Sequence, residues 1–478
     1  MQSDRPSRST LWAGAILTMI ALLVTAVQSV AAQTQEPEKA SPEVQQLRDR
    51  LKQLEQTVQE LKTQITAIEQ PRIAPAAASS APSSSPPSTA ASPANSATKQ
   101  EKQGESSFQL YGFAMLDMGY DFKSNNPDWF DVVRPSKLPA FKDQFAPDGK
   151  TYFGVRQSRL GVKSSTATSL GELKTIFEFE LFGSGVDAGQ TTFRLRHAYG
   201  ELGHFGAGQY WTVFGDTDAY PNSIEYWGPN GLVWFRNIQV RWMPLKGNNA
   251  VTLALERPGA SGDQGVLADR IELQGIRPKF DLPDLTGNVR FTRDWGHVQF
   301  AGVVRRIRWI DTINDQFDLG GSATGWGTSL SSALKFGKKD VGRFQVTYGE
   351  GIENYMNDAP ADVGIARSNS TNPARPIKGV ALPVLGFSTF LDHNWSKRFS
   401  SAAGYSMVNI DNSEGQAPDA YRRGHYALAN LLFYPYENVM VGGEFQWGRR
   451  ENFADGFASN DYRIQFAFKY NFAKAFTF

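Results

Sequence analysis

The chain has 478 residues, of which 41% are hydrophobic and 12% aromatic, with a formal net charge of +1 and no Cys. The near-zero charge excludes a broad basic surface for nucleic acid, and the missing Cys excludes disulfide scaffolds, Cys-ligated zinc and iron–sulfur clusters. So many aromatic residues at this apolar content are unusual for soluble cores, so the aromatic side chains are expected to serve another purpose.

Residues 1–32 are predicted to be a secretory signal peptide. Arg5 and Arg8 precede an apolar stretch at 11–27, and Ala31 and Ala32 supply the small residues that signal peptidase requires before Gln33. An uncleaved membrane anchor is the alternative, because the stretch approaches the roughly 20 residues of a spanning helix. The rest of the chain has no comparable apolar run, which excludes a multi-helix membrane protein.

Residues 33–70 are predicted to form a coiled-coil helix. Apolar residues recur there at alternating spacings of three and four, with polar residues between them. The predicted core positions are Val44, Leu47, Leu51, Leu54, Val58, Leu61, Ile65 and Ile68. Burying this stripe against copies of the chain predicts a homo-oligomer, although these residues admit either a dimer or a trimer, and a helix packed on its own domain remains an alternative. Residues 71–107, rich in Pro, Ala and Ser, are predicted to be an extended spacer.

Residues 108–478 are predicted to be all-β, forming a transmembrane antiparallel β-barrel of about 16 strands. Long segments alternate apolar and polar residues, as the strands of a barrel do between lipid and lumen. The last segment is the clearest, with one face made of Tyr462, Ile464, Phe466, Phe468, Tyr470 and Phe472 and the other of Arg463, Gln465, Lys469 and Asn471. A soluble sandwich is disfavoured, because its strands average about 5 to 6 residues.

Connections of two lengths support the barrel. Long loops are predicted near 123–150, 183–190, 215–232, 258–282, 311–323, 356–379, 411–420 and 451–460, and short turns near 165–170, 203–204, 244–249, 294–296, 337–340, 395–398 and 435–438. Outer-membrane barrels combine long outer loops with short periplasmic turns, and an even strand number places both barrel ends on one side. The prediction is therefore a bacterial outer-membrane protein in contact with lipid, with its coiled coil in the periplasm. Aromatic residues near strand ends, among them Tyr120, Trp395 and Tyr355, are predicted to form interfacial girdles.

Basic residues predominate on the polar faces of the predicted strands, which indicates a water-filled lumen that favours small anions. The predicted pore-lining residues are Arg159, Arg194, Arg196, Arg241, Arg290 and Arg305. Arg306 competes with its neighbour Arg305 for the lumen side. For any single Arg, neutralisation by a wall acid such as Glu178 or Glu180 is an equally good reading.

The third long loop, 215–232, carries Asp216, Asp218 and Glu225. If this loop folds inward, it constricts the pore and sets its acids opposite the arginines, creating a transverse field that orients a dianionic or dipolar solute. A loop that points outward is the alternative. Enzymatic activity is not expected, because the five His show no shared catalytic motif, and no cofactor or metal site is predicted.

Three strand motifs carry a resemblance to a known family. They are Phe108-Gln109-Leu110-Tyr111-Gly112-Phe113, Gln157-Ser158-Arg159-Leu160-Gly161 and Phe193-Arg194-Leu195-Arg196-His197-Ala198-Tyr199-Gly200. Together with the predicted signal peptide, coiled coil and spacer, they resemble the DcaP-like family of trimeric outer-membrane porins. The resemblance implies a homotrimer of sixteen-stranded barrels that passes small dicarboxylates, including aromatic ones such as phthalate.

The leading hypothesis is an anion-preferring channel for passive diffusion of small solutes, with dicarboxylates favoured by the arginines and by the resemblance. A sugar or general porin is the alternative within transport. An envelope tether, in which the barrel only anchors the periplasmic coiled coil, is the structural alternative.

Overall fold

The computed structural model of this chain describes residues 106–477. The predicted signal peptide, the predicted coiled coil with its eight core positions, and nearly all of the predicted spacer lie outside the described residues. Within 106–477, no helix is both long and apolar enough to cross a bilayer.

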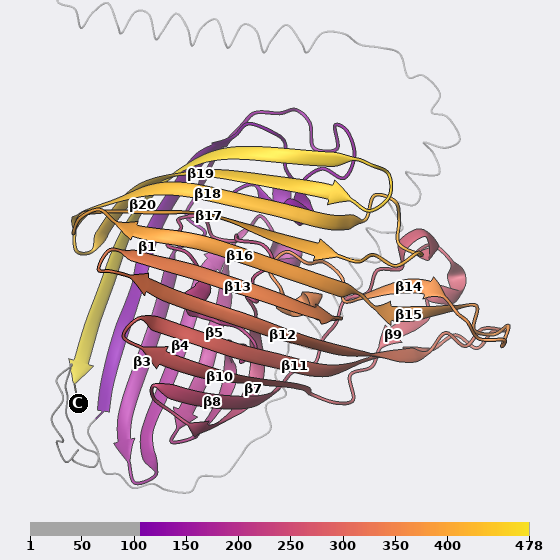
Figure 1. Cartoon of the computed structure of the whole chain (residues 1–478), viewed down its shortest axis with the longest axis horizontal. Coiled ribbons are helices and arrows are strands. Elements are labelled where there is room, and N and C mark those ends of the chain that lie inside the picture. The colour runs from indigo at the N-terminus through magenta and orange to yellow at the C-terminus, as the bar shows by residue number, and fades with distance from the viewer. Residues whose placement is uncertain (1–105, 478) are drawn as a thin grey trace, which may run out of the picture. The chain divides into compact units, whose positions relative to one another are not determined.

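The described chain forms a closed antiparallel β-barrel of sixteen strands (Figure 1). The barrel strands are β1 (Ser106–Asp121), β3 (Arg159–Thr168), β4 (Gly171–Phe182), β5 (Thr191–Leu202), β6 (Phe205–Trp211), β7 (Arg236–Leu245), β8 (Asn249–Glu256), β10 (Asp284–Arg293), β11 (Gly296–Asp311), β12 (Gly321–Phe336), β13 (Asp340–Glu350), β16 (Pro383–Asn394), β17 (Phe399–Ile410), β18 (Tyr421–Tyr436), β19 (Val439–Asn452) and β20 (Ala458–Thr477). Each strand pairs with its neighbours in the chain, and β1 closes the barrel by pairing with β20 from Ser107 opposite Thr477 to Asp121 opposite Arg463.

Four shorter strands lie outside the sixteen, two that extend the barrel wall and two in a separate hairpin. They are β2 (Lys150–Gly154), β9 (Ile276–Pro278), β14 (Val363–Arg367) and β15 (Ile377–Ala381). Strand β2 continues the line of β3 by pairing with the last five residues of β1, and β9 continues the line of β10 along the end of β11. Strands β14 and β15 form a separate two-stranded hairpin. Single-turn 3-10 helices occur at Pro127–Trp129, Pro135–Lys137, Gly185–Asp187, Thr217–Ala219, Gly265–Leu267, Ile271–Leu273 and Glu353–Tyr355.

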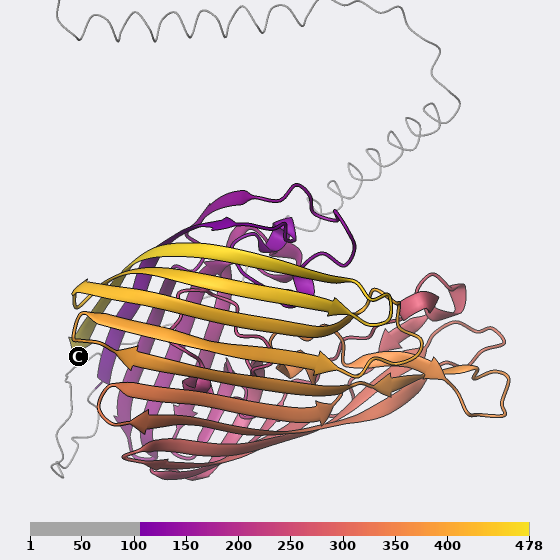
Figure 2. The same cartoon turned by 45° about the horizontal axis from the view of Figure 1, so that its top comes forward.

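The long and short connections lie at opposite ends of the barrel, as predicted. We number the long loops L1 (122–158, which includes β2), L2 (183–190), L3 (212–235), L4 (257–283), L5 (312–320), L6 (351–382), L7 (411–420) and L8 (453–457). The short turns fall at the seven predicted positions. Figures 1 and 2 show the end of β20 beside the short turns, and the hairpin β14–β15 projecting from the opposite end. In outer-membrane barrels the long loops lie at the extracellular end and the short turns at the periplasmic end, and the two ends of this barrel are named accordingly.

The alternation of side chains follows the pleat of the strands, because successive residues of a strand point to opposite faces. On β20, Phe466 is 53% exposed while its neighbour Gln465 is fully buried. On β11, Arg305 points inward and is buried, whereas Arg306 lies on the exposed face, which decides between the two. The apolar outer surface is therefore the surface that meets lipid.

Tyr120 and Trp395 are exposed, as a girdle position requires, but the girdle prediction is wrong for Tyr355. Tyr355 is 1% exposed and lies in the 3-10 helix of L6, and its hydroxyl donates a hydrogen bond to Asp284 at 2.9 Å. Loop L6 turns back into the barrel at this point. The girdle prediction used only the position of aromatic residues near strand ends, which does not reveal such a turn.

Candidate functional site

Loop L3 crosses the inside of the barrel from wall to wall. Near its start, Asp216 accepts hydrogen bonds from His297 on β11 and Ser331 on β12, at 2.6 and 2.7 Å. Further along, the backbone N–H of Ile224 donates to Glu444 on β19 at 3.0 Å. Near its end, Asn230 accepts a hydrogen bond from Ser406 on β17 at 2.8 Å. Of the two paths that the sequence left open, the structure therefore has the inward one.

Loops L1 and L6 fasten L3 in this position. The guanidinium of Arg134 in L1 lies between the rings of Trp129 and Trp227, 4.1 and 4.0 Å from their centroids, and pairs with Asp358 of L6 at 2.9 Å. The backbone N–H of Val133 donates to the Glu225 carboxylate of L3 at 3.1 Å. These three loops therefore form one packed assembly inside the extracellular half of the lumen.

The three predicted acids of L3 differ in their environments. Burial opposes the ionisation of Asp216, yet its hydrogen bond from His297 keeps its pKa below the usual value. Burial raises the pKa of Glu225 to about 8, against the opposing hydrogen bond from the Gly228 N–H. Asp218 is the exposed acid, with 57% of its side chain accessible. Only Asp218 of these three thus presents its carboxylate to solvent.

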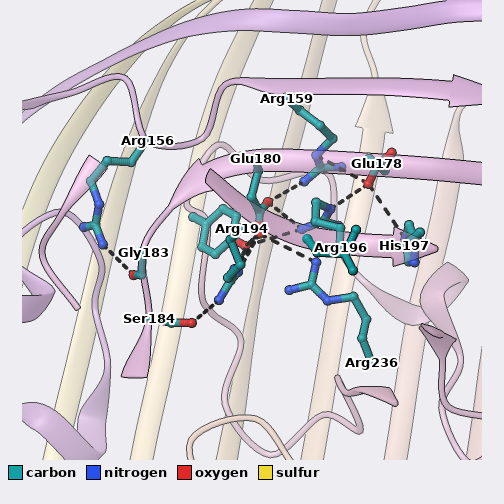
Figure 3. A network of polar contacts seen from close by, with 12 residues as sticks. Arg156, Arg159, Glu178, Glu180, Gly183, Ser184, Arg194, Arg196, His197 and Arg236 are labelled. Atoms are coloured by element: carbon teal, nitrogen blue, oxygen red, sulfur yellow. Dashed lines mark hydrogen bonds and ion pairs between the residues drawn. The ribbon is translucent and has the colours of Figure 1, made fainter. Parts of the chain in front are cut away.

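An arginine-rich cluster faces L3 on the wall formed by β3, β4 and β5 (Figure 3). Its centre is Glu180, whose carboxylate is 2.5 Å from Arg194 and 2.6 Å from Arg196. Arg159 approaches the same carboxylate at 3.4 Å, and Arg236 approaches it at 3.6 Å. The strand register brings these side chains together, because Arg159 lies opposite Glu180 in the β3–β4 pair and Arg194 lies opposite Glu180 in the β4–β5 pair.

A second carboxylate and a hydroxyl complete the cluster. Glu178 is 2.6 Å from Arg196 and accepts a hydrogen bond from the Tyr111 hydroxyl at 2.7 Å. The hydroxyl of Tyr226, which L3 carries to this wall, contacts both Glu180 and Arg194. L3 therefore reaches the cluster directly and forms part of the same polar surface.

The cluster carries more positive than negative charge. Its guanidinium groups, from Arg159, Arg194, Arg196 and Arg236, number four, against the two carboxylates of Glu178 and Glu180. The ion pairs that the sequence allowed are thus present, yet they leave a formal surplus of two positive charges. Arg159 and Arg194 keep 24% and 21% of their side chains exposed, so a solute can reach them.

The hydrogen-bonding of the arginines in this cluster is incomplete. The Nε of Arg159 and one terminal nitrogen of Arg236 are buried and make no hydrogen bond within residues 106–477, but they lie 3.7 Å from Glu178 and 3.6 Å from Glu180, at ion-pair distance. Guanidinium groups bind carboxylates through paired N–H donors, so the partly exposed Arg159 and Arg194 favour an anionic oxygen ligand.

The other predicted pore-lining arginines lie apart from the cluster. Arg241 lies on the inner face of β7, where it donates to Gln239 and to the Trp211 carbonyl oxygen, the latter at 2.6 Å. Arg290 pairs with Asp216 at 3.2 Å and also with Asp218, so it anchors L3.

Arg305 points inward but is covered by loops. Its guanidinium pairs with Asp284 and Asp362, both at 3.1 Å, and its side chain is 1% exposed. The predicted set therefore divides into the cluster around Glu180, a separate Arg241 on β7 and two arginines that hold loops.

Sequence reasoning missed Arg236 and Tyr226. By the alternation of β7, Arg236 belongs to the outward face, because its neighbour Asn237 is buried on the inner side. The chain enters β7 directly from L3 inside the lumen, and this approach brings the Arg236 side chain to Glu180. Tyr226 gave no signal, because its role depends on the path of L3.

One group in the described residues has the ligand types of a metal site. Asp216, Asp218 and His297 place one potential ligand atom each within 4.8 Å of one another. Arg290 donates to both carboxylates, so a cation would have to displace its guanidinium. The arrangement is better suited to holding L3 against β10 and β11.

A closed sixteen-stranded barrel with a loop folded across its lumen and a charged inner wall is the architecture of an outer-membrane porin. The chain belongs to the DcaP outer membrane protein family, whose model matches residues 92–472.

Solved structures agree with this fold. The outer membrane channel DcaP of Acinetobacter baumannii superposes with a TM-score of 0.64 at 20% identity, covering 77% of this chain and 97% of that one. An anion-selective porin from Comamonas acidovorans gives a TM-score of 0.50 at 11% identity, covering 77% of this chain and all of that one. No curated protein sequence matches this chain.

Proposed function

We propose that this protein is an anion-preferring porin through which small dicarboxylates diffuse passively. The observation that carries the proposal is the cationic surplus of the cluster around Glu180, exposed in the lumen beside the loop that crosses it. A dianion restores neutrality to a surface with two uncompensated positive charges. Its two carboxylates also match the planar donor pairs of arginine side chains.

Two features favour a carboxylate over a neutral solute. The partly exposed guanidinium groups of Arg159 and Arg194 present N–H donors to the lumen, and hydrogen bonds from a charged donor are strongest to an anionic acceptor. A sugar would bring hydroxyl groups but no charge to compensate the surplus. The anion-selective Comamonas porin shares this barrel fold, which supports channel activity without identifying the solute.

The test is electrical. The purified protein is reconstituted in a planar bilayer, and the reversal potential is measured under a salt gradient before and after adding succinate or phthalate. We expect anion selectivity and a concentration-dependent block of the current by either dicarboxylate. Selectivity for cations, or equal block by an uncharged sugar, would refute the anion proposal and favour the general-porin alternative.

We further propose that the channel is a homotrimer and that residues 33–70 form a periplasmic coiled coil. The support is the heptad pattern of Val44 to Ile68 and the family to which the barrel belongs. Deleting residues 33–107 from the mature chain tests this together with the tether alternative. A porin keeps its conductance without this segment, whereas loss of envelope integrity with unchanged solute uptake would favour the tether.

A further inference from the structure

The outer wall of the barrel carries a group of positive charges at its extracellular end. Arg306 and Arg308 lie on the outward face of β11, and the exposed Arg257 directly follows the buried, inward Glu256 of β8. The exposed Arg277 of β9 and the exposed Lys279 after it complete the group. We call these five basic residues the outer cationic patch. In Figure 1, β8, β10 and β11 lie side by side in the wall, and β9 continues it toward the hairpin β14–β15.

The strands set the depth of this patch in the membrane. Leu255 on β8 and Val304 on β11 are 53% and 56% exposed, on the surface that meets lipid. Arg257 and Arg306 follow two residues later on the same face. At a rise of about 3.4 Å per residue and a strand tilt of roughly 40°, this step moves them about 5 Å toward the extracellular side. The patch therefore lies at the level of the lipid headgroups, directly above apolar side chains that contact acyl chains.

The charges of the patch are poorly balanced. Asp281 shares this face and pairs with Arg308 at 2.5 Å. Arg277 donates to two backbone carbonyl oxygens, at 2.6 and 2.9 Å. The side chains of Arg257 and Lys279 have no hydrogen-bond or ion-pair partner among residues 106–477. Five basic residues against one acid leave a formal surplus of four positive charges, in a chain whose net charge is +1.

A second outward group at the same end of the barrel is nearly balanced. Arg423 on β18 and Arg449 on β19 share the carboxylate of Glu451, at 3.7 and 2.9 Å. Hydroxyl groups, in contrast, stand beside the outer cationic patch, because the exposed Ser322 and Thr324 of β12 lie opposite Arg308 and Arg306 in the strand register. The patch thus offers both positive charge and neutral donors.

We propose that the outer cationic patch binds the phosphorylated headgroup of a glycolipid of the outer leaflet. Guanidinium groups bind phosphate oxygens through paired N–H donors. The glycolipid of bacterial outer membranes carries a phosphate at each end of a disaccharide, with acyl chains below it. Arg257 and Arg306 stand two strands apart, or about 10 Å, so a headgroup with two separated phosphates can meet both. Its acyl chains then lie along the exposed Leu255 and Val304.

This site does not depend on the proposed pore function. The arginine cluster around Glu180 faces the lumen, whereas the patch lies on the other side of the wall. Loss of lipid binding leaves the selectivity of the channel unexplained by lipid, and loss of selectivity leaves the patch in place.

The test measures lipid binding to the full-length mature protein, refolded in detergent micelles so that no host lipid is carried over. The probe is lipid A with two phosphates, and native mass spectrometry counts the bound molecules during a titration. Single-channel conductance, which depends on the lumen, reports that each variant is folded. Phosphatidylglycerol and inorganic phosphate are titrated in parallel.

Two substitutions remove cations that have no partner in the described chain. Arg257→Gln and Lys279→Gln should each weaken lipid A binding about fivefold, the effect of one basic residue beside an anionic membrane surface, and the double variant about 25-fold. Lys279→Arg should keep the affinity. Arg293→Gln is the matched control, because Arg293 is exposed on the outward face of β10 but at the periplasmic end. Its affinity should equal that of wild type.

Three outcomes would overturn the proposal. Equal affinity for lipid A in the double variant and in Arg293→Gln would show that the patch does not hold the headgroup. Phosphatidylglycerol bound as tightly as lipid A would show attraction to any anionic lipid. Inorganic phosphate that displaces lipid A at equal concentration would show a site for a free anion. None of these results bears on the reversal potential, which tests the pore function separately.

Discussion

Removing the guanidinium of Arg236 is the sharpest test of the cationic surplus. Its closest carboxylate, Glu180, is 3.6 Å away and is held more tightly by Arg194 and Arg196, so Arg236→Gln leaves no carboxylate without a partner. An ion passing about 6 Å from one charge in water gains or loses about 0.7 kcal/mol, and screening at 0.1 M salt reduces this to about 0.4 kcal/mol. Anions lose this amount and cations gain it, which predicts a ~4-fold fall in the anion-to-cation permeability ratio.

The assay is the reversal potential of single channels under a KCl gradient, measured for wild type and Arg236→Gln. Arg306→Gln is the matched control, because Arg306 has the same charge but lies on the outward face of β11. The reasoning is refuted if the permeability ratio of Arg236→Gln equals that of wild type, or if Arg306→Gln changes it equally.

Three further substitutions test the roles of single residues. Glu180→Gln removes a negative charge and should increase anion selectivity. It should also lower the unfolding temperature of the barrel, measured by heating samples before electrophoresis, because loss of one partner from a buried pair costs about 3 to 5 kcal/mol. Unchanged thermal stability would contradict this. Glu225 has a pKa of about 8 in the folded protein, above its usual value, so the folded state retains a proton that the unfolded chain has lost, and stability should fall as pH rises toward 8. Glu225→Gln should flatten that dependence in unfolding measurements between pH 5 and 9, and an identical slope would rule out this carboxyl as its source. Arg134→Gln removes two cation–π contacts and an ion pair with Asp358, so it should loosen L1, L3 and L6 and increase the fluctuations of the single-channel current. Current recordings as quiet as those of wild type would show that the contacts of Arg134 do not hold the loops.

The strands and their connections were predictable because each depends on residues close together in the chain. Period-two alternation marks a barrel strand by itself, as in the exposed Phe466 beside the buried Gln465. Turn residues mark the short connections in the same local way. Neither the alternation nor the turn residues depend on what fills the barrel's interior, so the strand number and the loop positions could be predicted from the sequence.

The path of L3 could not be predicted, because its contacts join residues far apart in the chain. The Ile224 N–H meets Glu444, 220 residues later, and Asn222 meets Asp392, 170 residues later. No local pattern records such pairings. Tyr355 was misassigned for the same reason, since an aromatic residue beside a strand end looks alike whether its loop turns outward or returns to the lumen.

The arginines show why charge pairing and ion selectivity were not true alternatives. The sequence offered neutralisation of Arg194 and Arg196 by Glu178 and Glu180 as the competitor to an anion-selective wall, and the structure contains these pairs. Pairing removes selectivity only where the charges balance. L3 delivers Arg236 to Glu180, which Arg159 already approaches, so the two acids are shared among more guanidinium groups than they can neutralise. The acids then fix the arginines in place, and the surplus charge remains available to a passing anion.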